Sequence, residues 1–169
     1  AAAPLAQAIA FEAGQEPADR SADTGYPLYE QLARVLRTEV TARAIDGGSL
    51  SVILIQLSDY HHLVSAGGLE RTSRVIESIF SAAQKIADGG VRCFHYKNDG
   101  QLAVICPDLD FDGAALFALD LLRWAAETSS PDASGVRAEI MVGYSSLASG
   151  VDDANALLRM AENLLAMQR

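Results

Sequence analysis

Apolar and polar residues alternate along the chain with a period that changes from segment to segment. From Pro27 onward, apolar residues recur every three or four positions, which predicts an amphipathic helix with Pro27 in its first turn. Gly47 and Gly48 end this pattern. The next run, Ser49–Leu57, is continuously apolar and β-branched, so it predicts a strand that is buried on both faces.

The rest of the chain continues this alternation of helical and strand patterns. In order, it predicts a short helix over 58–65, an interruption at Gly67 and Gly68, a helix over 69–87, a β-hairpin over 91–107, a helix over 111–126, a loop over 128–135, a strand over 136–146, and a last helix capped by Asp152 or Asp153.

The hairpin is the most informative local pattern in the chain. Two apolar runs flank Asn98, Asp99 and Gly100, and these residue types tolerate the left-handed backbone that a tight turn requires. The tip of such a hairpin is exposed, and exposed tips on rigid scaffolds often carry function. The tip is therefore the first place to look for chemistry.

The order of elements predicts the fold class. A strand, helix, hairpin, helix and strand in this order form an α+β, ferredoxin-like sheet that is mainly antiparallel, with helices packed on it. We expect this domain to occupy residues 25–169. Residues 1–24 are predicted to be a helix followed by a polar linker, which would connect the domain to a preceding one.

Composition limits the partners and the compartment. The formal net charge is -9 and the sequence pI is about 4.7, which argues against binding of nucleic acid or of an anionic membrane surface. Cys93 and Cys106 are too few for a disulfide scaffold, so we expect a reducing compartment, the cytoplasm. The two thiols and His95 are scattered, and buried cysteines with a strand histidine explain them better than a metal site does.

Several segments, in order, resemble a known signalling module. They are SADTGYPLY over 21–29, QLSDYH over 56–61, NDGQL over 98–102, MVGYS over 141–145 and LLRMAENLLAMQR over 157–169. The ordered set resembles the GGDEF domain of diguanylate cyclases, from about Ser21 to Arg169. The resemblance implies the ferredoxin-like GGDEF/nucleotidyl-cyclase-type fold, with the element order βααββαβα.

The same resemblance implies that the chemistry of the family has been lost. Joining two GTP molecules needs Mg²⁺, which prefers carboxylate oxygens. The family supplies them from its D-I-D strand end and from the acidic pair of the signature, and these positions are Gln56, Gly100 and Gln101 here. No catalytic residue, metal ion or cofactor is therefore expected. Asp99 and Asp59 are nearby acids, and they would have to act in a shifted register.

Other family positions have changed as well. The positions that recognise guanine in the family are Val64 and Ser73 here, and the inhibitory R-x-x-D motif falls on Gly89–Arg92, where it is absent. Arg169 matches a phosphate-contacting lysine of the family and Arg159 matches a family arginine, and both are weak candidates for nucleotide binding. As plain helix cations on a solvated surface they need no function.

Three functions remain open from the sequence. The leading hypothesis is a non-catalytic, degenerate GGDEF-like domain that regulates or binds another signalling protein or domain, or a second copy of itself. The alternative is a receptor that binds cyclic di-GMP or GTP without turnover. An active diguanylate cyclase with a displaced site is the third.

Overall fold

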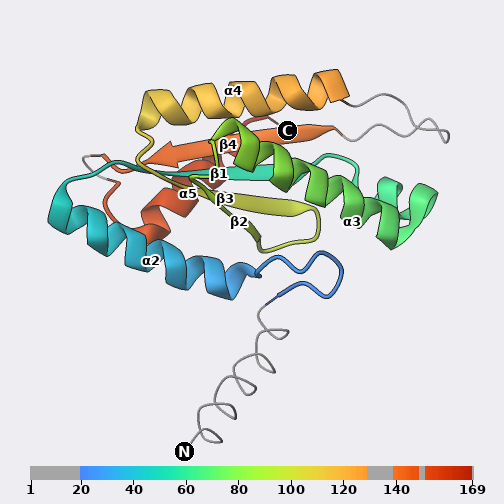
Figure 1. Ribbon diagram of the computed structural model, residues 1–169, viewed down its shortest axis with the longest axis horizontal. Coiled ribbons are helices and arrows are strands. Elements are labelled where there is room, and N and C mark those ends of the chain that lie inside the picture. The colour runs from blue at the N-terminus through green and yellow to red at the C-terminus, as the bar shows by residue number, and fades with distance from the viewer. Residues whose placement is uncertain (1–19, 129–138, 149–150, 169) are drawn as a thin grey trace, which may run out of the picture.

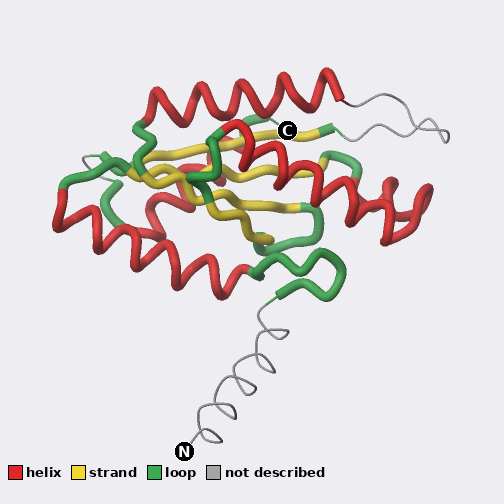
Figure 2. Tube along the Cα trace, viewed as in Figure 1, coloured by secondary structure: helices red, strands yellow, loops and turns green. Residues whose placement is uncertain are grey.

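A four-stranded antiparallel sheet forms the centre of the protein (Figures 1 and 2). The structure, a computed structural model, describes residues 20–128, 139–148 and 151–168. The strands are β1 (Leu50–Leu57), β2 (Arg92–His95), β3 (Gln101–Pro107) and β4 (Ile140–Ser146), in the spatial order β2-β3-β1-β4. Because β1 pairs in antiparallel fashion with both β3 and β4, the predicted α+β, ferredoxin-like plan is confirmed.

Helices cover both faces of the sheet. Helices α3 (Tyr60–Ile86) and α4 (Phe111–Thr128) lie on one face, and α2 (Tyr29–Asp46) and α5 (Ala154–Ala166) lie on the other (Figure 1). Alternate residues of β1 enter two separate apolar cores: Ile53 and Ile55 pack with α3 and α4, and Val52 and Leu54 pack with α2 and α5. This arrangement explains why the strand is apolar at every position but Ser51 and Gln56, and it confirms burial on both faces.

Some element boundaries differ from the predicted ones. The first helix begins at Tyr29 with Leu28 as its cap, and Pro27 lies before it because its carbonyl accepts a hydrogen bond from His95 N at 2.8 Å. The interruption predicted at Gly67 and Gly68 is confirmed, because the backbone leaves the helical conformation at Gly68 (φ 82°, ψ 168°). The element α3 therefore consists of two helical segments that are joined at a kink.

The cap of the last helix is the second of the two predicted aspartates. Asp153 is extended, and its Oδ1 accepts a hydrogen bond from Ala156 N at 2.7 Å. Three predictions lie partly or wholly outside the described residues: the helix and most of the linker in 1–24, the loop over 128–135, and the first residues of the strand predicted over 136–146. The described part of that strand begins at Ile140.

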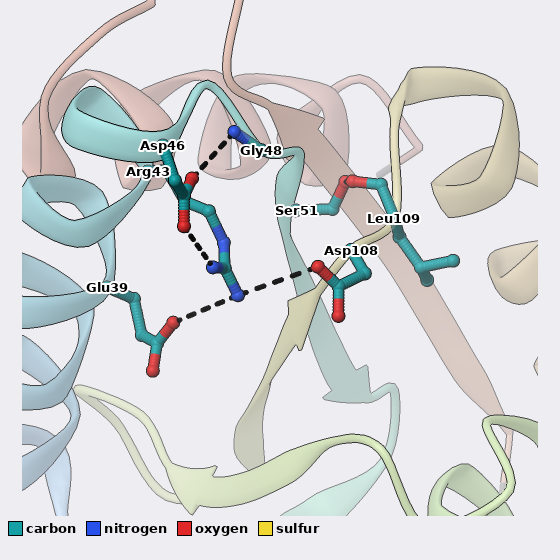
Figure 3. A network of polar contacts seen from close by, with 7 residues as sticks. All are labelled: Glu39, Arg43, Asp46, Gly48, Ser51, Asp108 and Leu109. Carbon is teal, nitrogen blue, oxygen red and sulfur yellow. Dashed lines mark hydrogen bonds and ion pairs between the residues drawn. The ribbon is translucent and has the colours of Figure 1, made fainter.

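An arginine network fixes the end of the sheet that lies away from the hairpin tip. Figure 3 shows Arg43 of α2 between three carboxylates, with Nη2 3.5 Å from Glu39 and 3.7 Å from Asp108, and Nη1 3.2 Å from Asp46. Asp108 follows β3, so the network joins the end of α2 to the end of β3. The Asp46 carboxylate also accepts a hydrogen bond from Gly48 N at 2.8 Å, which orders the turn into β1.

Candidate functional site

A cavity of about 500 Å³ lies at the end of the sheet where β1 ends and β3 begins. Its walls come from the loop and first helical turn over 21–30, from residues 60–76 of α3, and from the hairpin over 95–100. In Figure 1 the first turns of α3 lie at the right, and the loop before α2 and the β2–β3 hairpin lie between them and the centre of the view. A cavity of this volume is within the range of pockets that hold small ligands, so it is the candidate site.

The hairpin tip forms one wall and has the predicted turn. Gln101 N donates to Asn98 O at 3.0 Å, and Gly100 has a φ of 79°, a backbone conformation that glycine adopts without strain. The Gln101 side chain closes the turn, because its Oε1 accepts hydrogen bonds from the backbone N and the Nδ2 of Asn98, both at 3.2 Å. Gln101 thus stabilises the turn.

The three positions that the sequence resemblance assigns to the acidic signature have separate surroundings. Gly100 lines the cavity and packs against Tyr60, whose Cβ would be 2.8 Å from a Cβ built on Gly100. Gln56 and Gln101 lie opposite each other on β1 and β3, and neither is among the described residues that line the cavity. The space beside position 100 that an acidic side chain would enter is filled by Tyr60.

A histidine and a threonine connect the hairpin to the loop over 21–28, which we call the entry loop. His95 Nε2 lies 2.7 Å from Thr24 Oγ1, and its ring packs edge-on against Phe80 with the centroids 5.7 Å apart. Burial lowers the pKa of His95, although the carboxylates of Asp23 and Asp99 act in the opposite direction. The imidazole is therefore neutral at pH 7, and it positions the loop that carries Thr24.

A second polar cluster joins the hairpin to α5. Glu162 Oε1 accepts hydrogen bonds from the Tyr96 hydroxyl and from Lys97 Nζ, the latter at 2.9 Å. Lys97 Nζ also lies 5.5 Å from the ring centroids of both Tyr29 and Tyr96, a cation–π arrangement. Burial raises the pKa of Glu162, but the two hydrogen bonds outweigh it, so this pKa lies below its ordinary value.

The charge of the cavity is negative. Of the described residues that line it, Asp23, Glu30 and Asp99 carry carboxylates, whereas Lys97 carries the one side chain that is always cationic at neutral pH. The Lys97 ammonium is already paired with Glu162. Within the described ranges, no group of three or more His, Cys, Asp or Glu side chains is arranged to hold a metal ion. Such a lining disfavours an anionic phosphate chain.

The other sequence candidates are dispersed. Ser73 lines the cavity, whereas Val64 and Asp59 are not among its described lining residues. Arg159 is exposed on α5, and Arg169 lies outside the described residues. Cys93 and Cys106 are free thiols in the core, and burial raises the pKa of each to about 12, so both are unreactive.

Sequence reasoning missed the contribution of α5 to the site. Glu162 is an ordinary polar position in the helical pattern, and nothing in the local sequence connects it with Tyr96 or Lys97, which lie more than sixty residues earlier. Tyr29 is visible in the sequence as the last residue of the SADTGYPLY segment over 21–29. Its contact with Tyr96, at 5.4 Å between ring centroids, depends on the fold.

Among the described residues, no helix has the combination of length and apolarity that a membrane crossing needs. No family model matches the sequence, and no curated protein matches it. Solved structures, in contrast, match its fold, and three of them illustrate the likeness.

The coiled coil and GGDEF domain of DgcB from Caulobacter crescentus, solved in complex with c-di-GMP, is similar with a TM-score of 0.77, at 13% identity, over 98% of this chain and 92% of that one. The active GGEEF domain of a diguanylate cyclase from Vibrio cholerae has a TM-score of 0.74, at 16% identity, over 83% and 88% of the two chains.

The diguanylate cyclase SiaD from Pseudomonas aeruginosa, solved with its activator SiaC, has a TM-score of 0.75, at 15% identity, over 97% of this chain and 63% of that one. At these identities the likeness establishes the fold, which is that of GGDEF domains. It does not extend to the chemistry, for which only the residues of the site are informative.

Proposed function

We propose that this chain is a non-catalytic GGDEF-like domain that serves as a regulatory or protein-interaction module in bacterial cyclic di-GMP-type signalling. The proposal is supported by the neutral residues Gln56, Gly100 and Gln101 at the positions to which the resemblance assigns the acids of the family. It is supported further by Tyr60, which packs on Gly100. A two-metal phosphoryl transfer needs carboxylates that hold the ions beside the triphosphate. Neutral side chains at these positions cannot supply that charge.

The proposal includes the boundaries and the compartment. The module comprises residues 25–169, residues 1–24 connect it to a neighbouring domain, and the protein acts in the cytoplasm. Its partner is another signalling protein or domain, or a second copy of the chain. A precedent for a protein partner is SiaD, a protein of similar fold that was solved in complex with its activator SiaC.

Turnover of GTP tests the first part of the proposal. The purified chain, incubated with GTP and either Mg²⁺ or Mn²⁺, is expected to form no cyclic di-GMP when the nucleotides are separated by chromatography. An active diguanylate cyclase in parallel shows that the assay works. Product that disappears in the variants Asp99→Asn or Asp59→Asn would instead establish a displaced catalytic site, because these are the acids nearest to the lost positions.

A nucleotide receptor without turnover is the second candidate, and the cavity of about 500 Å³ beside the hairpin favours it. The negative lining opposes it, because cyclic di-GMP and GTP are anions. Calorimetric titration with each nucleotide separates the two candidates. We expect no heat of binding, and a dissociation constant in the micromolar range for either nucleotide would contradict a purely protein-binding role.

A further inference from the structure

We propose that the cavity beside the hairpin tip binds a guanidinium group, the arginine side chain of a partner protein. This inference rests on the proposed function, since it names the group by which a partner would be recognised. It is carried by three properties of the cavity: the placement of two carboxylates, the aromatic surfaces beside them, and the volume.

The first property is a pair of exposed carboxylates that line the same cavity. Asp23 lies on the entry loop and Asp99 on the hairpin tip, and both line the cavity. Both also act electrostatically on Tyr60, whose pKa is raised by burial and then by Asp99 and Asp23. None of the ion pairs between described residues includes either aspartate. Two carboxylates that line one cavity favour a cation within it.

The second property is the aromatic wall. Tyr29, Tyr60 and Tyr96 all line the cavity. The Lys97 ammonium already lies over Tyr29 and Tyr96, whereas Tyr60 is in none of the cation–π contacts between described residues. A guanidinium group stacks on an aromatic face and donates two parallel hydrogen bonds to a carboxylate, whereas an ammonium group is a compact, strongly hydrated charge. A site with both aromatic rings and carboxylates therefore suits arginine better than lysine.

The third property is size and access. The cavity measures about 500 Å³, which is in the range that accommodates a whole small ligand, so an arginine and its flanking backbone fit. Lys97, the cation of the lining, is held by Glu162 at 2.9 Å and lies against Tyr29 and Tyr96, and no ion pair between described residues joins it to Asp23 or Asp99. The same lining repels phosphate, which separates this proposal from nucleotide binding at the cavity.

The probe is the peptide acetyl-Gly-Arg-Gly-amide, added to the ¹⁵N-labelled chain and followed by amide chemical shifts. We expect shifts at residues around the cavity, among them Thr24, Tyr60 and Asn98, with a dissociation constant of about 1 mM, as suits a single anchored side chain. The matching citrulline peptide has nearly the same shape and no charge, and it should bind at least about tenfold more weakly. Equal binding of the two peptides, or shifts away from the cavity, would overturn the proposal.

Paired variants test the carboxylates. The double variant Asp23→Asn, Asp99→Asn keeps the size of both exposed side chains. It should raise the dissociation constant of the arginine peptide at least about tenfold. The control Asp88→Asn, Glu127→Gln removes the same charge from exposed positions outside the cavity lining, and it should change binding less than about twofold. A control variant that weakens binding as much as the cavity variant would show a net-charge effect and contradict the site.

Two further ligands separate the possible outcomes. Methylguanidine carries the same group without a peptide, and if it binds as tightly as the peptide, the assignment to a partner's side chain is wrong. Cyclic di-GMP that displaces the peptide would overturn both this inference and the proposed function. Absence of any shift with the peptide at about 10 mM, tenfold above the expected constant, overturns the arginine site alone, because the non-catalytic role is tested separately with nucleotides.

Discussion

Gly100 lies so close to Tyr60 that a Cβ atom at position 100 would be 2.8 Å from Tyr60 Cβ and 3.0 Å from Tyr60 Cγ. The glycine also has a φ of 79°, which other residues adopt only with strain. Two independent constraints therefore hold a glycine at this position. An acidic side chain here would need a different turn or a displaced α3, so a catalytic acid is not one substitution away.

Replacement of Gly100 by alanine should destabilise the fold through both constraints. The control is Gly89→Ala, because Gly89 has nearly the same φ, 80°, and a Cβ atom added there would have no neighbouring atom within 4 Å. We expect Gly89→Ala to lower the free energy of unfolding by about 1 kcal/mol through backbone strain alone. Gly100→Ala should cost about 1–3 kcal/mol more because of the overlap with Tyr60.

Urea denaturation of the two variants measures this difference. The additional substitution Tyr60→Ala in the Gly100→Ala variant should restore little of the lost free energy of unfolding. The shortest contact is to Tyr60 Cβ, which alanine retains. Equal destabilisation by Gly89→Ala and Gly100→Ala would show that Tyr60 does not restrict position 100, and an acidic side chain could then be accommodated there without moving α3.

The sequence could predict the elements of this fold because their patterns are local. The apolar run of β1, the Asn-Asp-Gly turn and a cap at Asp152 or Asp153 each require only a few neighbouring residues. The structure confirms all three, with Asp153 as the cap. The start of the first helix could not be placed, because Pro27 is drawn out of the helix by a hydrogen bond from His95, a residue far along the chain.

The candidate site was predictable only in part, for the same physical reason. The turn residues of the hairpin tip and the composition of the entry loop are visible in the sequence. The filling of the space beside Gly100 by Tyr60 and the link from Lys97 to Glu162 depend on how α3 and α5 pack on the sheet. Contacts between residues this far apart have no local signal.

The Tyr96–Glu162 hydrogen bond should stabilise the junction between the hairpin and α5. In a double-mutant cycle with Tyr96→Phe and Glu162→Gln, we expect a coupling of about 1 kcal/mol, as for a partly exposed hydrogen bond to a charge. A second cycle with Lys97→Met and Glu162→Gln measures the other donor to Glu162. We expect a smaller coupling energy in this cycle, because Lys97 is more exposed than Tyr96. Additive effects of Tyr96→Phe and Glu162→Gln would contradict the link.

The Glu162 carboxylate also makes the stability of the fold depend on pH in the acid range. The pKa of Glu162 is lower in the folded state than its ordinary value of 4.5, because the hydrogen bonds outweigh burial. Its contribution to stability is therefore present above pH 4.5 and is lost as the pH falls through the folded-state pKa. Unfolding free energies measured from pH 6 downward should show a steeper loss below about pH 4.5 for the natural chain than for Glu162→Gln.

His95 predicts a separate loss of stability at milder acidity. Burial lowers the pKa of His95 below its ordinary value of 6.5, so the folded state binds this proton less readily than the unfolded chain. The contribution to stability is complete above pH 6.5 and is lost as the pH falls towards the folded-state pKa. In the variant His95→Gln, which keeps an amide near Thr24, the free energy of unfolding should depend less on pH over this range. A pH dependence equal to that of the natural chain would contradict the prediction. His62→Gln, at an exposed position, controls for histidine removal.

The side-chain amide of Gln168 pairs with the backbone of β4 at the outer edge of the sheet. Its Nε2 donates to Val142 O, and its Oε1 accepts from Val142 N at 3.3 Å, so both groups of one residue on an edge strand are paired. Unpaired backbone groups at a sheet edge can pair with a strand of another molecule.

Gln168→Ala should therefore lower the free energy of unfolding by about 1 kcal/mol and increase self-association with concentration. Met167→Ala, an exposed neighbour, is the control. Sedimentation velocity over a concentration series measures the effect, and identical behaviour of the two variants would show that the Gln168 amide does not protect the edge.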